Sequence, residues 1–262
     1  MKIFIIPYRN REAQMHVFLS HMKYLLEDIP EKDYRIYLVN QVDARPFNRG
    51  AMRNIGFLEG KKRFPDTYKE IDFVFHDLDN LVGKKNSVTF TTVPNKVNHI
   101  FGNYDGVNIG GIFVMKGGDF EKVNGYPNFW GWGYEDTALG IRCRRKNIEC
   151  VRKTFSWKDK RIVHLDYTPS MPVAQKIENR FNKNTLLWMK KGSILKEGVD
   201  TIKDIHLQER SFSSSVKILN VTHFNCNISE KNYSPYEIWL VMPNFLSWLK
   251  TKQHLFQKNR LV

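Results

Sequence analysis

Short apolar runs alternate with helix-like segments in the first part of the chain. The runs are compact and rich in β-branched and aromatic residues, which predicts buried strands at 2–6, 34–40 and 71–76. Between the first two runs, apolar residues recur every three or four positions, the spacing of an amphipathic helix. The residues with this spacing are Met15, Phe18, Met22, Leu25 and Leu26. A second helix is expected from residue 47 to about residue 60, and the alternation predicts an α/β fold with a mostly parallel sheet covered by helices.

The later part of the chain continues this pattern less regularly. The elements expected there are, in chain order, a strand at 110–115, a short helical link at 120–123, a helix at 137–146, a strand at 161–166, a helix at 175–191 and a helix–turn–strand unit over 198–223 with its strand at 216–221. From residue 224 the composition shifts to aromatic and apolar residues with lysines after them. We therefore predict one domain over residues 1–223 and a basic, aromatic extension over 224–262.

The net charge adds little to this prediction of the fold, but it bears on the binding partner. The 262 residues include 41 Lys and Arg against 27 Asp and Glu, a formal net charge of +14. Such a field favours an anionic partner, which could be nucleic acid, an acidic membrane surface or a diphosphate ligand. The basic residues are spread along the chain without a basic arm or zinc-finger spacing, so we expect no nucleic-acid partner.

Cysteine usage and apolar run lengths bear on the compartment. The three cysteines, Cys143, Cys150 and Cys226, form no disulfide framework, which indicates free thiols. The apolar run at the N-terminus is too short for a signal peptide, and no run of about twenty apolar residues predicts a membrane span. We therefore expect a cytoplasmic or membrane-peripheral protein. The segment 236–260 could pack on the domain, touch a membrane surface or form an oligomer contact, and packing ranks first.

The most concentrated chemistry lies at residues 124–136. This stretch holds two tryptophans, three glycines and an adjacent carboxylate pair. Trp130 and Trp132 offer flat apolar faces on which a sugar ring can stack. Glu135 and Asp136 can bond sugar hydroxyls, and one of them can accept a proton. The alternative is a buried aromatic turn whose carboxylates cap a helix.

Acidic residues after the third predicted strand suggest a metal site. Asp77 and Asp79 follow a buried strand, where unpaired carboxylates are hard to accommodate. Hard oxygen ligands suit Mn²⁺ or Mg²⁺, although solvated turn aspartates are the alternative. His164 and Asp166 alternate on a predicted strand, face the same side and could complete a metal site with Asp79.

Two further features indicate a bound ligand. Arg9 and Arg11 follow that strand, at the edge where open α/β sheets bind ligands. Their guanidinium groups suit a phosphate or the edge of a base, and solvated arginines are the alternative. Gly110 and Gly111 open another strand and allow a ligand to approach the backbone closely.

The order of these motifs resembles the β-1,4-galactosyltransferase family, the inverting glycosyltransferase family 7. The resemblance runs from about residue 3 to 223 and is most specific at Phe47-Asn48-Arg49 and at 129–136. The segments 40–43 and 76–79 are similar to the branch that galactosylates xylose on proteoglycan linkers. The resemblance implies a GT-A fold with a Rossmann-like nucleotide-binding half. It also implies a UDP-sugar donor, a saccharide or glycan acceptor, a β-1,4 linkage and Mn²⁺.

The resemblance assigns roles to individual residues. The positions implied for the donor and its nucleotide are Pro7, Arg9, Arg11, Phe47, Arg49, Asp77, Asn108, Gly110, Gly111 and Trp132, the last on a mobile loop. Asp136 matches the catalytic base and Glu135 its acceptor-binding neighbour. Trp130 is also expected to contact the acceptor.

The metal ligands implied by the family change at two positions. Arg161 stands where the enzymes acting on N-acetylglucosamine have a methionine ligand. Asp166 stands where the xylose branch has a second histidine, and a carboxylate is a good ligand for Mn²⁺. The predicted metal ligands are therefore Asp79, His164 and Asp166.

Two other departures concern the substrates. Thr137 replaces an acidic residue after the Glu-Asp pair, so the hydrogen bonds to the acceptor must differ. Asn108 aligns with a family tyrosine that shapes the pocket for the donor sugar. Galactose is the expected hexose, while a transferase that uses UDP-N-acetylgalactosamine or UDP-glucose and a non-catalytic carbohydrate-binding module stay open as alternatives.

Overall fold

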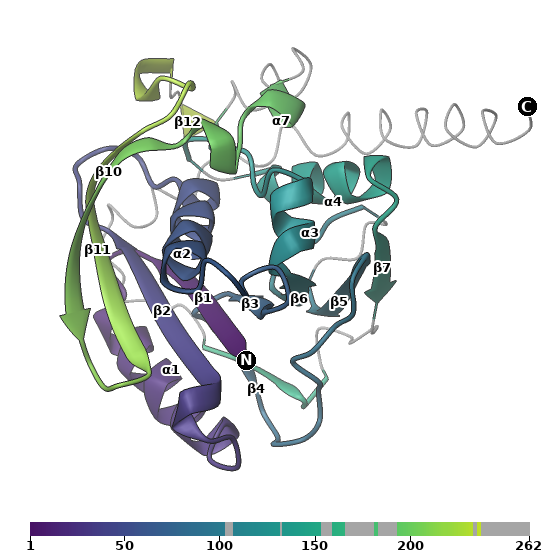
Figure 1. The fold of residues 1–262 in the computed structure, drawn as a ribbon. Coiled ribbons are helices and arrows are strands. Elements are labelled where there is room, and N and C mark those ends of the chain that lie inside the picture. Colours follow the sequence, from purple (N-terminus) through teal and green to yellow (C-terminus); the bar gives the residue numbers. More distant parts are fainter. Residues whose placement is uncertain are drawn as a thin grey trace, which may run out of the picture.

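A mixed sheet of eight strands forms the centre of the molecule (Figure 1). The structure is a computed structural model that describes residues 1–102, 107–131, 133–152, 159–165, 181–182, 193–232 and 235–236. The strands of the sheet are β1 Lys2–Tyr8, β2 Tyr34–Gln41, β3 Asp72–His76, β5 Lys96–Phe101, β6 Ile112–Lys116, β7 Glu149–Arg152, β10 Lys203–Ser211 and β11 Val216–Asn225. Their order across the sheet is β10-β11-β2-β1-β3-β6-β5-β7.

The middle of this sheet is parallel. β11, β2, β1 and β3 run in the same direction, and Ile5 of β1 lies between Tyr37 of β2 and Phe75 of β3. The pairs β3–β6, β6–β5 and β10–β11 are antiparallel, and β5–β7 is parallel. Four of the seven pairings are thus parallel, as the strand–helix alternation predicts.

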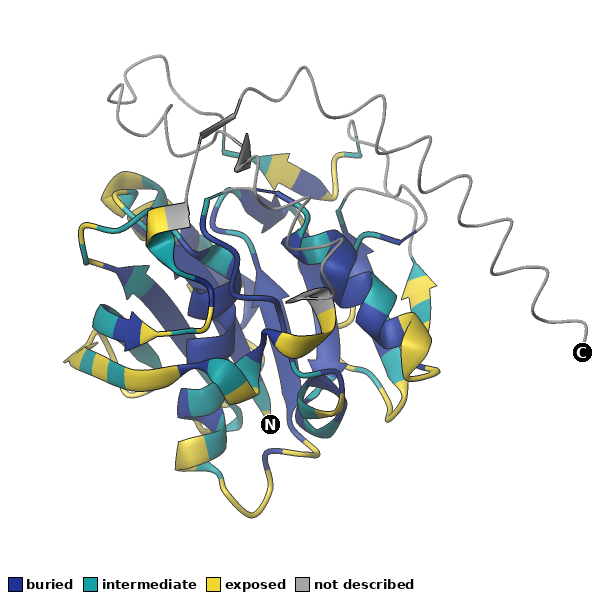
Figure 2. Cartoon of the chain, turned by 90° about the horizontal axis from the view of Figure 1, so that it is seen from above, coloured by how far each residue is buried: buried dark blue, intermediate teal, exposed yellow. Residues whose placement is uncertain are grey.

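Helices cover both faces of the sheet. The helices are α1 Glu12–Leu25, α2 Arg49–Arg63, α3 Gly117–Lys122, α4 Glu135–Arg145 and α7 Ser193–Lys196, with short 3-10 turns at Glu31–Asp33, Val199–Thr201 and Glu230–Asn232. Successive side chains of a strand point to opposite faces. In β1, Ile3 and Ile5 accordingly pack in the core beneath α2, α3 and α4, whereas Phe4 and Ile6 pack against α1. The central strands are buried along most of their length (Figure 2).

Two small strand pairs lie outside the main sheet. β4 Asn80–Val82 pairs with β8 Ile162–His164, and β9 Phe181–Asn182 pairs with β12 Pro235–Tyr236. The first pair joins two segments that are far apart in sequence. In it, Asn80 lies opposite His164. This pairing brings the chain after β3 to the predicted metal histidine.

Most of the predicted elements are confirmed within a few residues, and two predictions need correction. The helix expected at the start of 198–223 is wrong: after a short 3-10 turn, that segment forms β10, which pairs with β11 as a hairpin. β10 lies at the sheet edge with mostly exposed side chains, so it lacks the apolar run that marks a buried strand. The helix expected at 175–191 is contradicted at β9, and the rest of that range lies outside the described residues.

The first residues of the predicted C-terminal extension belong to a strand of the main sheet. The boundary expected at residue 223 falls within β11, and Phe224 is fully buried. Residues 237–262, which include nearly all of the segment considered for membrane contact, lie outside the described residues. In the part of the chain that the structure describes, none of the helices has both the length and the apolar character needed to span a membrane.

Candidate active site

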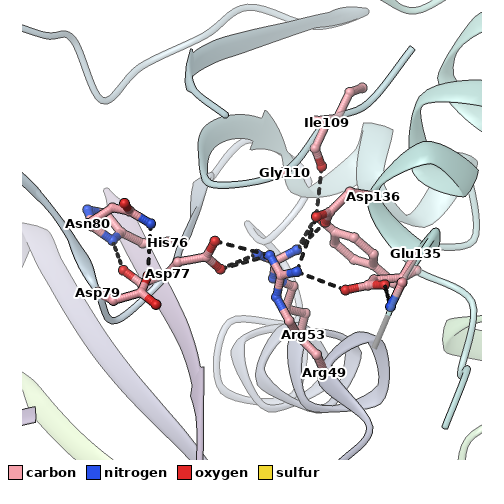
Figure 3. Close-up of polar contacts among 12 residues, drawn as sticks. Arg49, Arg53, His76, Asp77, Asp79, Asn80, Ile109, Gly110, Glu135 and Asp136 are labelled. Atoms are coloured by element: carbon pink, nitrogen blue, oxygen red, sulfur yellow. Dashed lines mark hydrogen bonds and ion pairs between the residues drawn. The ribbon is translucent and has the colours of Figure 1, made fainter. Parts of the chain in front are cut away.

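Five charged side chains meet beyond the carboxyl ends of the central strands, where α2 and α4 begin (Figure 3). They are Arg49, Arg53, Asp77, Glu135 and Asp136. Asp77 directly follows β3, Arg49 is the first residue of α2, and Glu135 is the first residue of α4. Open α/β sheets bind their ligands at this edge.

The two arginines contact three carboxylates, and two of these carboxylates contact both arginines. Arg49 donates to both oxygens of Asp77 at 2.9 and 3.1 Å, to Glu135 Oε1 at 2.8 Å and to Asp136 Oδ2 at 3.1 Å. Arg53 donates to Asp136 Oδ1 at 2.8 Å and to Asp77 Oδ1 at 2.7 Å. Residues four apart lie on the same face of a helix, so α2 directs both guanidinium groups to one place.

The electrostatics of this cluster follow from burial and pairing. Burial alone would raise the pKa of Asp77, but the charges of Arg49 and Arg53 outweigh it and hold that pKa below its usual value. For Glu135, burial and the neighbouring Asp136 raise the pKa in spite of Arg49. The sequence motif contained Arg49, whereas Arg53 was missed, although its position one helical turn later could have indicated it.

The glycine pair lies against the carboxylate of Asp136. A Cβ atom on Gly110 would come within 2.3 Å of Asp136 Oδ2, so any larger residue would displace that carboxylate. The Ile109 N–H donates to the Asp136 carbonyl at 3.0 Å, which ties the strand opening to α4. The carbonyl of Asn108 accepts a hydrogen bond from Arg152 at 2.9 Å. The structure thus brings the predicted residues Asn108, Gly110 and Asp136 into one neighbourhood.

A second group joins two of the predicted metal ligands through an amide. Asn80 donates to Asp79 Oδ1 at 2.8 Å, and Asn80 Oδ1 lies 2.8 Å from His164 Nδ1. With Nδ1 bonded in this way, the ring would ligate a metal through Nε2, and the amide would orient the ring as outer-shell partners do. Arg11 donates to Asp79 Oδ2 at 3.1 Å. The third predicted ligand, Asp166, lies outside the described residues.

The donor set suits Mn²⁺, which accepts carboxylate oxygen and imidazole nitrogen. Within the described ranges, no group of three or more His, Cys, Asp and Glu residues could hold a metal ion. The assignment of Asp79, His164 and Asp166 as metal ligands stays a prediction, and Asp166 is two residues beyond His164 in the chain.

Two of the predicted nucleotide residues, Pro7 and Arg9, lie at the end of β1. Pro7 is buried within the strand. Arg9 donates to the carbonyls of Arg45 and Asp43, so its guanidinium holds the backbone after β2. Phe47 is half-buried, and its carbonyl accepts from Gly131 N at 2.9 Å. That hydrogen bond joins the chain before α2 to the aromatic loop.

Trp130 lies in the core, whereas the sequence predicted that it contacts the acceptor. Its side chain is only 1% exposed, and Nε1 donates to the Ile228 carbonyl at 2.6 Å. One indole face stacks on Phe224, with ring centroids 5.4 Å apart, and the Arg45 guanidinium lies 4.9 Å from the indole centroid. This packing places Trp130 in the core, so the expected stacking on an acceptor sugar does not fit its burial.

The loop after Trp130 enters α4 through unusual backbone conformations. Gly131 and Gly133 have φ of 79° and 122°, and Tyr134 has φ of 66°. A positive φ is readily adopted only by glycine, so the two glycines suit this turn. Gly133 N donates to Glu135 Oε2 at 3.1 Å, which fixes the carboxylate at the start of the helix. Trp132 lies outside the described residues.

Comparisons with known proteins identify relatives of this chain. A family model described as the N-terminal region of glycosyl transferase group 7 matches residues 2–91, and one described as the N-terminal domain of galactosyltransferase matches residues 94–166. β-1,4-galactosyltransferase 4 of Mus musculus is 35% identical over 157 residues, and that of Homo sapiens is 31% identical over 158. Each match covers 56% of this chain and 44% of the relative, so the chain spans about half the length of the curated relatives it matches.

Solved structures are similar over a larger share of the chain. The catalytic domain of Drosophila β1,4-galactosyltransferase 7, solved with xylobiose, has a TM-score of 0.62 at 22% identity and covers 88% of this chain and 96% of its own. A mutant of that protein, solved with manganese, UDP-Gal and xylobiose, has a TM-score of 0.61 at 21% identity. The predicted α/β fold of the GT-A glycosyltransferases is thereby confirmed.

Proposed function

Because this chain belongs to the glycosyl transferase group 7 family, whose models together match more than half of it, we propose that it is an inverting hexosyltransferase. It moves galactose from a UDP-sugar to a terminal sugar hydroxyl and forms a β-1,4 linkage. The observation that carries this proposal is the placement of Asp136 and Glu135 beside Asp77, at the sheet edge that also holds Asp79.

The reaction is a single displacement. Asp136 takes the proton of the acceptor hydroxyl while that oxygen attacks the anomeric carbon and the bond to the diphosphate breaks. Glu135 lies beside Asp136 and accepts a hydrogen bond from a neighbouring acceptor hydroxyl. Arg11, at the end of β1, contributes positive charge where the diphosphate would lie. Attack from the side opposite the leaving group inverts the anomeric centre.

A divalent metal would complete the donor site. Asp79, His164 and Asp166 would hold Mn²⁺, which supplies Lewis-acid stabilisation of the departing diphosphate. The related Drosophila enzyme was solved with manganese and UDP-Gal, which supports this choice of cofactor and donor. Its xylobiose ligand supports an acceptor of the xylose class. Asn108, beside Gly110 and Asp136, keeps UDP-N-acetylgalactosamine and UDP-glucose as alternative donors.

The proposal is tested by UDP release with Mn²⁺ across these three donors and UDP-N-acetylglucosamine, with xylosides, glucosides and N-acetylglucosaminides as acceptors. Release that one acceptor stimulates would identify both substrates. UDP binding without transfer to any acceptor would favour a carbohydrate-binding module instead. Absence of both binding and release would overturn the proposal.

The role of Asp136 is tested by Asp136→Asn. Loss of the base lowers the transfer rate by about 10²–10⁴-fold, while the affinity for UDP with Mn²⁺ stays the same. Asp66→Asn, which changes an exposed aspartate outside the site, is the matched control and retains wild-type transfer. Wild-type transfer by Asp136→Asn would contradict the assignment of the base.

A further inference from the structure

Arg53 is the most deeply buried charge of the active-site cluster. Its side chain is 0% exposed, against 15% for Arg49 and 21% for Asp77. A buried charge is unfavourable unless it is paired and hydrogen-bonded. Arg53 pairs with Asp77 and Asp136, and its Nη1 donates to the Tyr126 hydroxyl at 2.6 Å.

Tyr126 extends these contacts into a closed ring of hydrogen bonds. The Tyr126 hydroxyl donates to the Ile109 carbonyl at 3.1 Å, and the Ile109 N–H donates to the Asp136 carbonyl at 3.0 Å. Arg53 closes the ring by donating to Tyr126 Oη and to Asp136 Oδ1. The Arg53 guanidinium also lies 4.7 Å from the centroid of the Tyr126 ring. Both the backbone and the side chain of Asp136 are therefore fixed by the same network.

Arg49 differs from Arg53 in its position and in the kind of partners it has. It lies at the first residue of α2, is partly exposed and contacts three carboxylates. Its hydrogen bond to Asp136 Oδ2, at 3.1 Å, is longer than the bond of Arg53 to Asp136 Oδ1, at 2.8 Å. Arg49 is therefore the more accessible of the two guanidinium groups.

We propose that Arg53 is a positioning residue for Asp136: it holds Oδ1 and ties it to Asp77, so that Oδ2 is the atom that takes the proton from the acceptor. This inference rests on the proposed transferase function. Arg53 lies one helical turn inside α2, beyond the Phe-Asn-Arg motif, and touches no substrate in this assignment. It acts through Asp136, whereas Asp77 also accepts two hydrogen bonds from Arg49.

The main test is Arg53→Met, which keeps a long, helix-compatible side chain and removes the charge and the donors. A misplacement of a catalytic group by about 1 Å can cost about 10²-fold in rate. We therefore expect kcat for transfer to fall by about 10²-fold, with the KM of the acceptor and the affinity for UDP with Mn²⁺ unchanged. Lys62→Met, at an exposed position of the same helix, is the control and retains the wild-type kcat.

A double-mutant cycle separates positioning from a general structural role. In the Asp136→Asn background, the base is already lost, so Arg53→Met should cause no further loss of kcat in single-turnover assays. An equal loss in both backgrounds, or a loss of UDP binding, would show that Arg53 only supports the fold. Wild-type kcat in Arg53→Met, when the wild-type protein transfers, would overturn this inference alone. Absence of transfer by the wild-type protein would overturn the proposed function itself.

Two milder variants cover the case in which Arg53→Met does not fold. Arg53→Lys keeps the charge but lacks the planar fork that reaches two carboxylates, so it should restore kcat only in part. Tyr126→Phe keeps Arg53 and removes one of its acceptors, which should lower kcat by about 2–10-fold, the range of one hydrogen bond. Wild-type kcat in both variants would contradict the positioning role.

Discussion

Replacing Trp130 by phenylalanine separates core packing from sugar binding. The indole is 1% exposed, stacks on Phe224 and donates through Nε1 to the Ile228 carbonyl. Phenylalanine keeps an apolar ring in the same space but has no donor. The variant therefore removes what the structure assigns to Trp130 while preserving most of an aromatic face.

The loss of stability can be worked out from these contacts. The Ile228 carbonyl would keep only the weak Cys226 thiol donor, so the loss of the indole N–H costs about 1–3 kcal/mol. The smaller ring loses part of the stacking area on Phe224, about 1–2 kcal/mol at about 0.8 kcal/mol for each buried carbon. The sum is about 2–5 kcal/mol, compared with about 5–15 kcal/mol for the total stability of a typical domain. The variant should therefore fold but unfold at lower urea concentration.

The assay combines urea unfolding, followed by circular dichroism, with transfer kinetics. We expect a lower midpoint at an unchanged slope, and an unchanged KM for the acceptor. Phe224→Leu, on the opposite side of the stack, should behave in the same way. Phe18→Leu, in the core against α1, controls for destabilisation remote from the site. Wild-type stability together with an acceptor KM raised about tenfold would refute the packing role and restore sugar stacking.

Two further outcomes concern the metal site and pH. Asn80→Leu removes the amide between Asp79 and His164, so the affinity for Mn²⁺ with UDP should fall by about 10–100-fold in calorimetry, and an unchanged affinity would contradict this role. Burial lowers the pKa of His76 and of His99 to about 4. The unfolded chain then binds more protons between about pH 6.5 and 4, so stability falls as the pH is lowered, by about 2 kcal/mol for each histidine at about pH 5. Urea midpoints at about pH 7 and 5 measure this, and equal midpoints would refute it.

The central elements could be predicted because their patterns arise from local packing. β1, β2 and β3 are buried on both faces, so each is a continuous apolar run, and α1 has one apolar stripe. The edge strands could not be predicted in this way. β7 and β10 consist of exposed and half-exposed positions, and pairing with a neighbouring strand, β5 for β7 and β11 for β10, rather than local composition makes them strands.

The residues of the candidate site could likewise be predicted only in part from the sequence. Carboxylates and arginines with the required chemistry can be identified along the chain, and Asp136, Glu135, Arg49 and Asp77 do meet. Arg53 was missed because an arginine within a helix normally lies on a solvated face.

By itself, the sequence determined the alternation of strands and helices and the residue types available for transfer chemistry. Only the tertiary structure decided which of those residues face one another and which are buried. Arg53 became part of the site because the fold brings it to Asp77, 24 residues away, and to Asp136, 83 residues away. Trp130 can lie in the core because Ile228, 98 residues away, supplies the hydrogen-bond acceptor for its N–H. Spacing along the chain specifies local periodicity, but long-range packing selects the side that each residue faces.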